Sequence, residues 1–183
     1  MNVAVCDYGA GNVRSVLAAF ARLGADARST RDPADILAAD LAVLPGVGSA
    51  ASAMRGMRER ELDAALRTRV AAGGRTLGIC LGLQLALEES EEDGGVSGLA
   101  LLPGRAVRLL EGRVPRMGWA SVEPEGEAFY FAHSYAAETP AATLHSEGIV
   151  AAAEAGSFLG VQFHPEKSGP AGARFLTRCL SRA

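Results

Sequence analysis

The sequence predicts an α/β fold with a mostly parallel central sheet and helices on both of its faces. Short apolar runs alternate with longer helical patterns through the first half, which is typical of parallel strands joined by helices. Glycine and proline punctuate the ends of these runs. The first unit is a strand over residues 3–6, a glycine-containing turn, and a helix over residues 12–23 with apolar residues at helical spacing.

The unit then recurs along the chain. Residues 40–44 read as a strand that ends at Pro45, a long helical pattern covers 52–72, and 76–79 reads as a strand that runs into a helix at Leu81. Beyond residue 105 the apolar segments become shorter and are separated by Gly and Pro, which predicts antiparallel strands appended to the parallel sheet: 106–110, 128–132, 143–145 and 158–163. A helix over 171–180 closes the chain.

Length and composition restrict the function. The 183 residues form a single predicted domain over 1–183, and the formal net charge of -3 with scattered arginines argues against a nucleic-acid partner. The N-terminus lacks a signal-peptide pattern and no apolar run is long enough to cross a bilayer, so we expect a cytoplasmic protein without membrane contact. Three distant cysteines fit neither a metal site nor a disulfide framework, and nothing in the sequence calls for a cofactor.

Cys80 lies between two glycines, Gly78 and Gly82, where a strand passes directly into a helix. This layout is that of a nucleophile elbow with Cys in place of Ser. The glycines allow the tight turn and the close approach of neighbouring chain, and a helix beginning at Leu81 would favour the thiolate through its N-terminal dipole. A buried core cysteine is the alternative interpretation, because Cys is among the most buried residue types.

A nucleophilic cysteine requires a base and a group that orients the base. His164 and Glu166 flank Pro165 near the C-terminus, and the proline favours an extended conformation at His164. In an extended segment Gln162, His164 and Glu166 would share one face, opposite Val161 and Phe163. His164 is therefore the predicted base and Glu166 its orienting carboxylate, whereas a structural histidine at a strand end is the alternative.

A loop over Gly46, Val47 and Gly48 follows another predicted strand, and the carboxyl ends of parallel strands meet at one edge of the sheet. Its amides, with that of Leu81, are predicted to stabilise a developing oxyanion. The alternative is an ordinary Pro-Gly turn. The acidic stretch over 88–93, which two glycines follow, is interpreted as a solvated loop without a functional role.

With these segments placed, the chain resembles the class I glutamine amidotransferases, and within them the glutaminase subunits of imidazole glycerol phosphate synthase, an enzyme of histidine biosynthesis. The resemblance spans nearly the whole chain in the family's order. It rests on six segments: DYGAGN (7–12), LPGVG (44–48), LGICLGLQ (77–84), VPRMGW (114–119), YFAHSY (130–135) and GVQFHPEKS (160–168). The first, fourth and fifth single out the subfamily.

The resemblance implies a flavodoxin-like fold and a glutaminase that acts through Cys80, His164 and Glu166. It implies that Gln84, Ser134 and Tyr135 hold the glutamine. Ammonia would pass to a separate, barrel-shaped cyclase subunit, which forms imidazole glycerol phosphate and aminoimidazole-carboxamide ribotide. A heterodimer with that cyclase is the expected assembly.

The same resemblance places the partner interface at Asn12, Met117 and Trp119, with Trp119 as an anchor. Packing of Trp119 in the core is the alternative. The sequence departs from the family's usual residues at three positions, where Arg116 replaces His, Ala120 replaces Asn and Ala50 replaces Phe. The first two lie in the segment expected near the partner, so they bear on docking rather than on hydrolysis. Asn12 is also a candidate cap of the first helix.

Two other functions are open at the level of sequence. Residues 7–14 partly match a dinucleotide-binding fingerprint, but Arg14 stands where the third glycine belongs. A stand-alone Cys-His hydrolase, such as a γ-glutamyl hydrolase or a peptidase, would have the same fold. Such an enzyme has no need of Asn12, Met117 and Trp119 as a partner-facing set.

Overall fold

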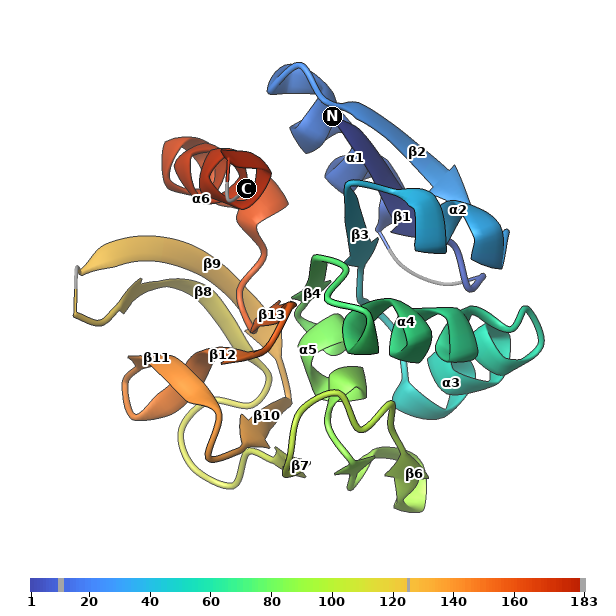
Figure 1. Ribbon diagram of the computed structural model, residues 1–183. Helices are drawn as coiled ribbons and strands as arrows, with labels where there is room; N and C mark the ends of the chain where they lie inside the picture. The colour runs from blue at the N-terminus through green and yellow to red at the C-terminus, as the bar shows by residue number, and fades with distance from the viewer. Residues whose placement is uncertain (10–11, 125, 182–183) are drawn as a thin grey trace.

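The computed structural model describes residues 1–9, 12–124 and 126–181. Its centre is a seven-stranded sheet in the order β11-β12-β13-β4-β3-β1-β2 (Figure 1). Five strands are parallel: β1 (Asn2–Cys6), β2 (Asp26–Thr30), β3 (Leu41–Leu44), β4 (Thr76–Ile79) and β13 (Phe158–Val161). Two antiparallel strands, β12 (Ile149–Ala155) and β11 (Ala142–Ser146), complete the sheet. The predicted α/β class is confirmed.

Helices cover both faces of this sheet (Figure 1). One face packs against α1 (Val13–Arg22) and α6 (Gly169–Ser181). The other packs against α2 (Pro33–Ala38), α3 (Ala50–Arg58), α4 (Leu62–Ala71) and α5 (Leu81–Ala86). None of the helices within the described ranges is long and apolar enough to cross a membrane.

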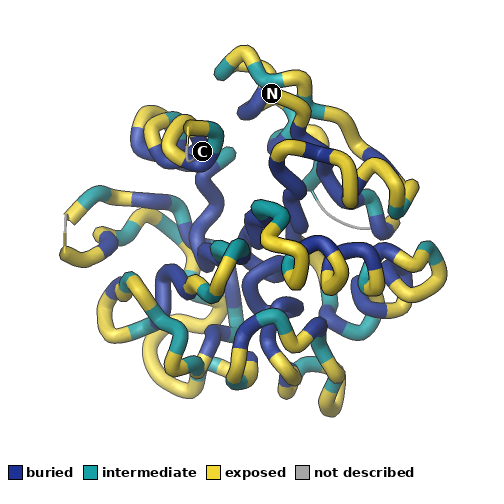
Figure 2. Tube along the Cα trace, viewed as in Figure 1, coloured by how far each residue is buried: buried dark blue, intermediate teal, exposed yellow. Residues whose placement is uncertain are grey.

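The strands β1, β3 and β4 are apolar apart from their first residues, Asn2 in β1 and Thr76 in β4, because both of their faces are covered. In β1, Val3 and Val5 pack in the cluster beneath α1 and α6, whereas Ala4 and Cys6 pack in the cluster beneath α2, α3 and α4. The tube in Figure 2 shows these strands as buried, with exposed residues on the outer surfaces of the helices and loops. Burial on both faces therefore holds the central strands, and the loops that follow them, in fixed positions.

Two smaller sheets flank the centre. One has the order β10-β7-β5-β6, from β5 (Glu89–Ser90), β6 (Val96–Ser97), β7 (Arg105–Arg108) and β10 (Tyr135–Glu138). The other is the hairpin of β8 (Arg116–Val122) and β9 (Glu127–His133). The short 3-10 helices η1 (Glu92–Gly94) and η2 (Pro165–Lys167) complete the elements. Among the described residues, only β11 and β12 are thus antiparallel additions to the central sheet, while β7, β8, β9 and β10 belong to the two smaller sheets. The strand predicted over 158–163 as an antiparallel addition is wrong in its place, because β13 lies inside the central sheet and pairs with β4 in parallel.

The predicted helix over 52–72 is wrong in one respect, because it is two helices. The chain leaves the α conformation between α3 and α4, where Glu61 has a φ of 56°. A left-handed conformation is unusual for a residue other than glycine. Because Glu61 adopts it here, the sequence carries no Gly or Pro at the position where the helix breaks. The predicted closing helix is confirmed, with two additional residues at its start and one at its end.

Candidate active site

Three segments of the chain meet where the parallel strands end. The loop 45–48 follows β3, Cys80 follows β4, and residues 162–168 follow β13. The register aligns the strand ends, since Leu44 pairs with Gly78 and Val161 pairs with Ile79. The carboxyl edge of a parallel sheet is the usual place for a ligand, and the predicted meeting of these segments is confirmed.

The turn at Cys80 is strained and closely packed. Cys80 has φ 52° and ψ -105°, and its amide donates to the Val161 carbonyl at 2.7 Å. A Cβ at Gly82 would lie 2.0 Å from the Leu44 oxygen, and a Cβ at Gly78 would lie 2.8 Å from the Gly82 oxygen. Both glycines are therefore required by close backbone approach, as the elbow prediction states.

The Cys80 sulfur is enclosed but faces polar atoms. The Cys80 side chain is largely buried and its Sγ lies 3.8 Å from the Ala132 carbonyl oxygen. On another side, Gln162 Nε2 donates to Sγ at 3.4 Å. An inert core cysteine would have apolar neighbours alone, so these surroundings favour the nucleophile over the core interpretation.

His164 and Glu166 form a buried pair beside the sulfur. Nδ1 of His164 lies 2.9 Å from Oε1 of Glu166, and both side chains are 2 % exposed. Since the carboxylate can only accept, Nδ1 carries the hydrogen and Nε2 is left to face the thiol. Burial opposes the imidazolium, but the side-chain bonds to Cys80 and Glu166 outweigh burial and raise the pKa of His164 to about 9.

The predicted extended path is only partly correct at this pair. His164 is extended, with φ -102° and ψ 91°, but Pro165 begins the turn η2, so Glu166 does not continue the strand. The Ser168 hydroxyl donates to the His164 carbonyl at 2.6 Å and holds that turn closed. Glu166 therefore reaches the imidazole through the turn and not through strand alternation. Gln162 and His164 do both reach Cys80, as a shared face requires.

The loop after β3 lies directly against the elbow. A Cβ at Gly46 would be 2.4 Å from the Leu81 Cβ and 2.5 Å from the Gly82 nitrogen. Gly48 has a φ of 107°, which only glycine adopts readily, and Val47 is exposed. The loop is thus more than a turn, since its backbone is packed at van der Waals distance over the start of α5.

These segments line a cavity of about 310 Å³. Its lining includes Cys80, Gln84, Ser134 and Tyr135, together with the loop 46–48 and Leu81. A larger cavity of about 470 Å³ lies beside α6, but Cys80 does not line it. His164 and Glu166 line neither of these two cavities. The smaller cavity is therefore the candidate active site, because it is the one that the sulfur reaches.

Glu92 also lines this cavity, and the sequence analysis missed it. The interpretation of 88–93 as a solvated loop is wrong at this residue, because Oε2 of Glu92 accepts from the Ala50 amide at 2.9 Å. Oδ2 of Asp93 accepts from the next amide, that of Ala51, at 3.1 Å. Burial raises the pKa of Glu92 above its usual value, although the Ala50 amide opposes the shift. The two carboxylates cap α3 from a distant segment, which no local pattern reveals.

Gln84 projects from α5 into the same region, but its amide nitrogen is already engaged. Nε2 donates to the Tyr135 carbonyl at 2.7 Å and to Oε1 of Gln162 at 3.1 Å. Both N–H groups therefore have partners, which leaves the Gln84 oxygen as the atom available to a ligand.

The hairpin β8–β9 separates its residues onto two faces. Met117 and Trp119 point outward and are 60 % and 59 % exposed, which shows that core packing of Trp119 is wrong. Arg116 points inward, with its guanidinium 4.3 Å from the Phe131 ring centroid and Nη2 bonded to Ser146 and Glu147. Ala120 packs inward as well. The two departures from the family pattern thus lie beneath the exposed face and not on it.

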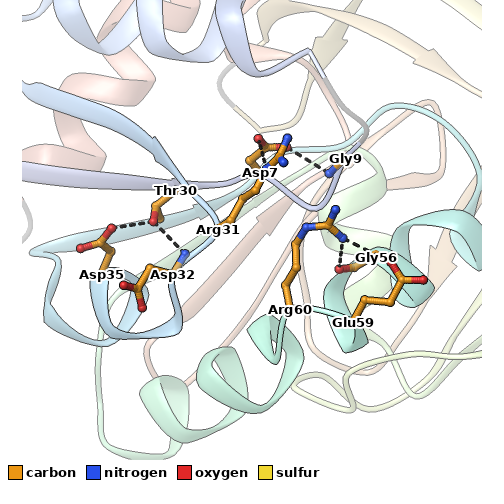
Figure 3. A network of polar contacts seen from close by, with 9 residues as sticks. All are labelled: Asp7, Gly9, Thr30, Arg31, Asp32, Asp35, Gly56, Glu59 and Arg60. Carbon is orange, nitrogen blue, oxygen red and sulfur yellow. Dashed lines mark hydrogen bonds and ion pairs between the residues drawn. The ribbon is translucent and has the colours of Figure 1, made fainter.

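The segment after β1 is fixed by ion pairs and backbone contacts (Figure 3). Asp7 accepts from Nε of Arg31 at 2.8 Å and from the Gly9 amide at 3.0 Å, and Arg60 donates to the Gly56 carbonyl at 2.9 Å. Asn12 is the N-cap residue of α1, as predicted, but its side chain makes no capping hydrogen bond. Ala10 and Gly11 of the same motif lie outside the described residues.

Comparison with known proteins gives the family. The family model described as "Glutamine amidotransferase class-I" matches residues 4–183. The chain belongs to the class I glutamine amidotransferase family. Within this family, it is 46% identical to the imidazole glycerol phosphate synthase subunit HisH of Methanothermobacter thermautotrophicus, over 95% of both chains. It is 43% identical to the subunit of the same name from Carboxydothermus hydrogenoformans, over 94% of this chain and 95% of the relative.

Solved structures support the fold of this amidotransferase chain. A crystal structure of a glutamine amidotransferase superposes with a TM-score of 0.80 at 22% identity, over 97% of this chain and 96% of that one. The PurLQS structure from Thermotoga maritima gives a TM-score of 0.75 at 17% identity, over 98% and 97%. At these identities the likeness concerns the fold, and it confirms the flavodoxin-like class I amidotransferase architecture.

Proposed function

We propose that the chain is the glutamine-hydrolysing subunit of an imidazole glycerol phosphate synthase, in histidine biosynthesis. The observation that carries this proposal is the buried His164–Glu166 pair that contacts Cys80, together with the cavity that Cys80 and the loop 46–48 line. Full-length similarity to subunits named for this enzyme supports the choice among amidotransferases.

The first step is attack of the Cys80 sulfur on the side-chain amide carbon of glutamine. A carbon–sulfur bond forms and the amide oxygen gains negative charge, which the Leu81 amide and an amide of the loop Gly46–Gly48 stabilise. The elbow holds the sulfur above the start of α5, so the oxyanion forms where that helix presents its amides.

His164 then moves the protons. Its imidazolium gives a proton to the amide nitrogen, the carbon–nitrogen bond breaks, and ammonia leaves a glutamyl thioester on Cys80. The neutral imidazole next takes a proton from water as the hydroxide adds to the thioester carbon. Breaking of the carbon–sulfur bond releases glutamate and returns Cys80 as the thiolate beside the imidazolium. Glu166 keeps the hydrogen on Nδ1 throughout.

The cavity also fits the amino-acid end of glutamine. Glu92 is the single acidic residue among the described residues that line it, and a free amino acid carries an ammonium group that a carboxylate attracts. We therefore assign Glu92 as the partner of the substrate ammonium. The Gln84 oxygen and the backbone of Ser134 and Tyr135 complete the contacts with the substrate.

Glu92→Gln tests that assignment. The Michaelis constant for glutamine should rise about 10- to 100-fold, since a charge-assisted hydrogen bond is lost. Glu89→Gln is the matched control, because Glu89 lies in the same acidic stretch, is exposed and does not line the cavity. An unchanged Michaelis constant in Glu92→Gln would remove Glu92 from the substrate site.

The ammonia would pass to a cyclase subunit, which uses it to form imidazole glycerol phosphate and aminoimidazole-carboxamide ribotide. Met117 lines the cavity and is also exposed on the hairpin, so a partner seated there would adjoin the site where ammonia is released. Trp119, two residues along the same face, would serve as the interface anchor, and Asn12 as a further contact.

The decisive experiment measures glutamate release from glutamine by the chain alone and with a cyclase subunit and its nucleotide. We expect low activity alone and a steep rise in the mixture. Cys80→Ala should abolish the glutamine-dependent synthase reaction but leave the reaction with added ammonium intact. High glutamate release by the chain alone, unchanged when the cyclase is added, would contradict the proposal and indicate a stand-alone hydrolase.

A further inference from the structure

A glutamine side chain lies against the candidate nucleophile with no exposure to solvent. Gln162 directly follows β13, is 0 % exposed, and places Nε2 3.4 Å from the Cys80 sulfur. Its backbone amide donates to the Ala151 carbonyl at 2.9 Å, so the residue is fixed between β12 and the elbow. A buried primary amide must find partners at both ends, and here one end meets the reacting atom.

The identity of the atom that faces the sulfur follows from a chain of three bonds. The Tyr135 carbonyl can only accept, so the Gln84 atom 2.7 Å from it must be Nε2. The second N–H of the same nitrogen points to Gln162, 3.1 Å away, where it requires an acceptor. Oε1 of Gln162 meets that requirement, and Nε2 of Gln162 is left to face Cys80. A backbone carbonyl thus sets the polarity of the whole relay.

We propose that Gln162 is a catalytic residue that donates a hydrogen bond to the Cys80 thiolate, and that Gln84 is a positioning residue that keeps this donor turned toward the sulfur. The proposal deepens the glutaminase function and, for its role in turnover, rests on it. A thiolate accepts such a bond much more strongly than a thiol or a thioester does, because the acceptor is charged. The bond therefore favours the charged form of the nucleophile.

A backbone carbonyl near the sulfur favours the thiol and so opposes the effect of this donor. The Ala132 carbonyl oxygen lies 3.8 Å from Sγ and repels a negative sulfur, although it can accept from a thiol. His164, two residues along the same segment, offers its charge to the sulfur but gives up its proton during turnover. Gln162 has no proton to give up, so its bond to the sulfur is available at each stage. It reforms when the carbon–sulfur bond of the thioester breaks and the thiolate returns.

The relay also changes the role of Gln84. Both of its N–H groups are engaged, by Tyr135 and by Gln162, so its effect on the sulfur is indirect. Without Gln84 the amide of Gln162 loses the contact that forbids the opposite orientation. The Gln162 side-chain amide could then rotate by half a turn and place Oε1, in place of Nε2, against the thiolate, which it would repel.

The test is the pH dependence of Cys80 alkylation by iodoacetamide, followed by mass spectrometry of the Cys80 peptide. The experiment uses the full chain alone, with the Cys80→Ala chain as the blank for Cys6 and Cys179. In Gln162→Leu the pH midpoint of alkylation should rise by about one unit, which is about tenfold less thiolate, or about 1.4 kcal/mol. In Gln84→Leu it should rise by less than in Gln162→Leu.

Thr76→Val is the matched control. It removes a buried hydroxyl from the opposite end of β4, where the side chain bonds the Gly74 carbonyl and does not reach Cys80. Its midpoint should equal that of the wild type, whatever its melting temperature. Gln162→Met keeps a long unbranched side chain and serves if the leucine variant does not fold. A folded leucine or methionine variant with an unchanged midpoint overturns the proposal.

Turnover provides the second readout. With the cyclase subunit present, kcat for glutamine should fall about tenfold in Gln162→Leu, while the ammonium-dependent reaction is unchanged. The alkylation experiment needs neither glutamine nor the cyclase. A wild-type chain with no glutaminase activity in the presence of the cyclase and its nucleotide would therefore refute the proposed function. An unchanged alkylation midpoint in folded Gln162→Leu would instead refute the role of Gln162.

Discussion

The Tyr8 hydroxyl donates to the Pro45 carbonyl at 2.6 Å, in the interior of the protein. This bond ties the end of β1 to the loop that borders the nucleophile. The carbonyl belongs to the peptide group that contains the Gly46 amide, so the bond fixes the plane from which that loop departs. Burial raises the pKa of Tyr8 above its usual value, and the phenol therefore remains a donor.

Tyr8→Phe should lower kcat for glutamine hydrolysis, although it costs the fold little stability. Loss of the hydroxyl removes about 1 kcal/mol from the free energy of unfolding and frees the loop over Cys80. We expect kcat with the cyclase to fall about 3- to 10-fold at an unchanged Michaelis constant, measured as glutamate release. Cys6→Ala, in the same strand end, is the control for destabilisation alone. An equal loss of kcat in both variants would show that the Tyr8–Pro45 hydrogen bond contributes to stability alone and not to the position of the loop.

His164→Ala should reduce kcat about a hundredfold more than Glu166→Gln does, because a proton carrier is indispensable and its orienting group is not. The bond from Glu166 contributes to the raised pKa of His164, about 9, so Glu166→Gln should shift the alkaline limb of the kcat/KM profile to lower pH. A pH-rate series on both variants tests this. A larger loss at Glu166 would contradict the assigned roles.

The same shift has a consequence for stability. The pKa of His164 is higher in the fold than the usual 6.5 of a histidine, so its stabilising effect is complete below about pH 6.5. That contribution is lost as the pH rises through about 9. Unfolding free energies of the wild type and of His164→Gln should therefore converge on the alkaline side.

His133 predicts a loss of stability in acid. Burial and the charges of Arg116 and His164 outweigh the bond to Tyr135 and lower the pKa of His133 to about 4. The unfolded chain binds a proton near pH 6.5 that the folded chain refuses, so stability falls between these values, by up to about 3 kcal/mol. His133→Asn keeps a donor for the Tyr135 carbonyl without a titrating group. Its unfolding free energy should show a flatter decline, and parallel curves would contradict the assignment.

Trp119→Ala should weaken the complex without affecting the fold. Trp119 is exposed and meets Tyr130 edge to face, with 6.2 Å between ring centroids. A central tryptophan of an interface typically contributes about 2 kcal/mol or more, so Kd for the cyclase should rise about 30-fold or more. Leu37→Ala on α2, away from the hairpin, is the matched control. Equal affinities of both variants and the wild type would place the partner elsewhere.

Much of the fold could be predicted because burial on both faces of the central strands leaves apolar runs. The strand β2 escaped, since its sequence Asp26–Thr30 is largely exposed at the edge of the sheet. The break between α3 and α4 escaped because Glu61 adopts a glycine-like conformation. The local sequence pattern predicts neither the strand β2 nor the break at Glu61, because the tertiary structure imposes both.

The site divided along the same lines. Cys80 and His164 were predictable because glycine and proline mark the local backbone that each one requires. Glu92 was missed because its partner, the Ala50 amide, lies 42 residues away in sequence. Gln162 carried one signal, a polar residue between Val161 and Phe163 in an apolar run, but its role depends on Gln84 and so on the folded arrangement.

The strands of the hairpin β8–β9 sort its residues onto two independent sides. Its outward pairs, Met117 with Ala132 and Trp119 with Tyr130, alternate with inward pairs such as Arg116 with His133. A substitution at an outward position therefore changes the surface of the hairpin and leaves the inner contacts of Arg116 with Phe131 and Glu147 in place. The two sides of one ribbon can thus accept substitutions separately.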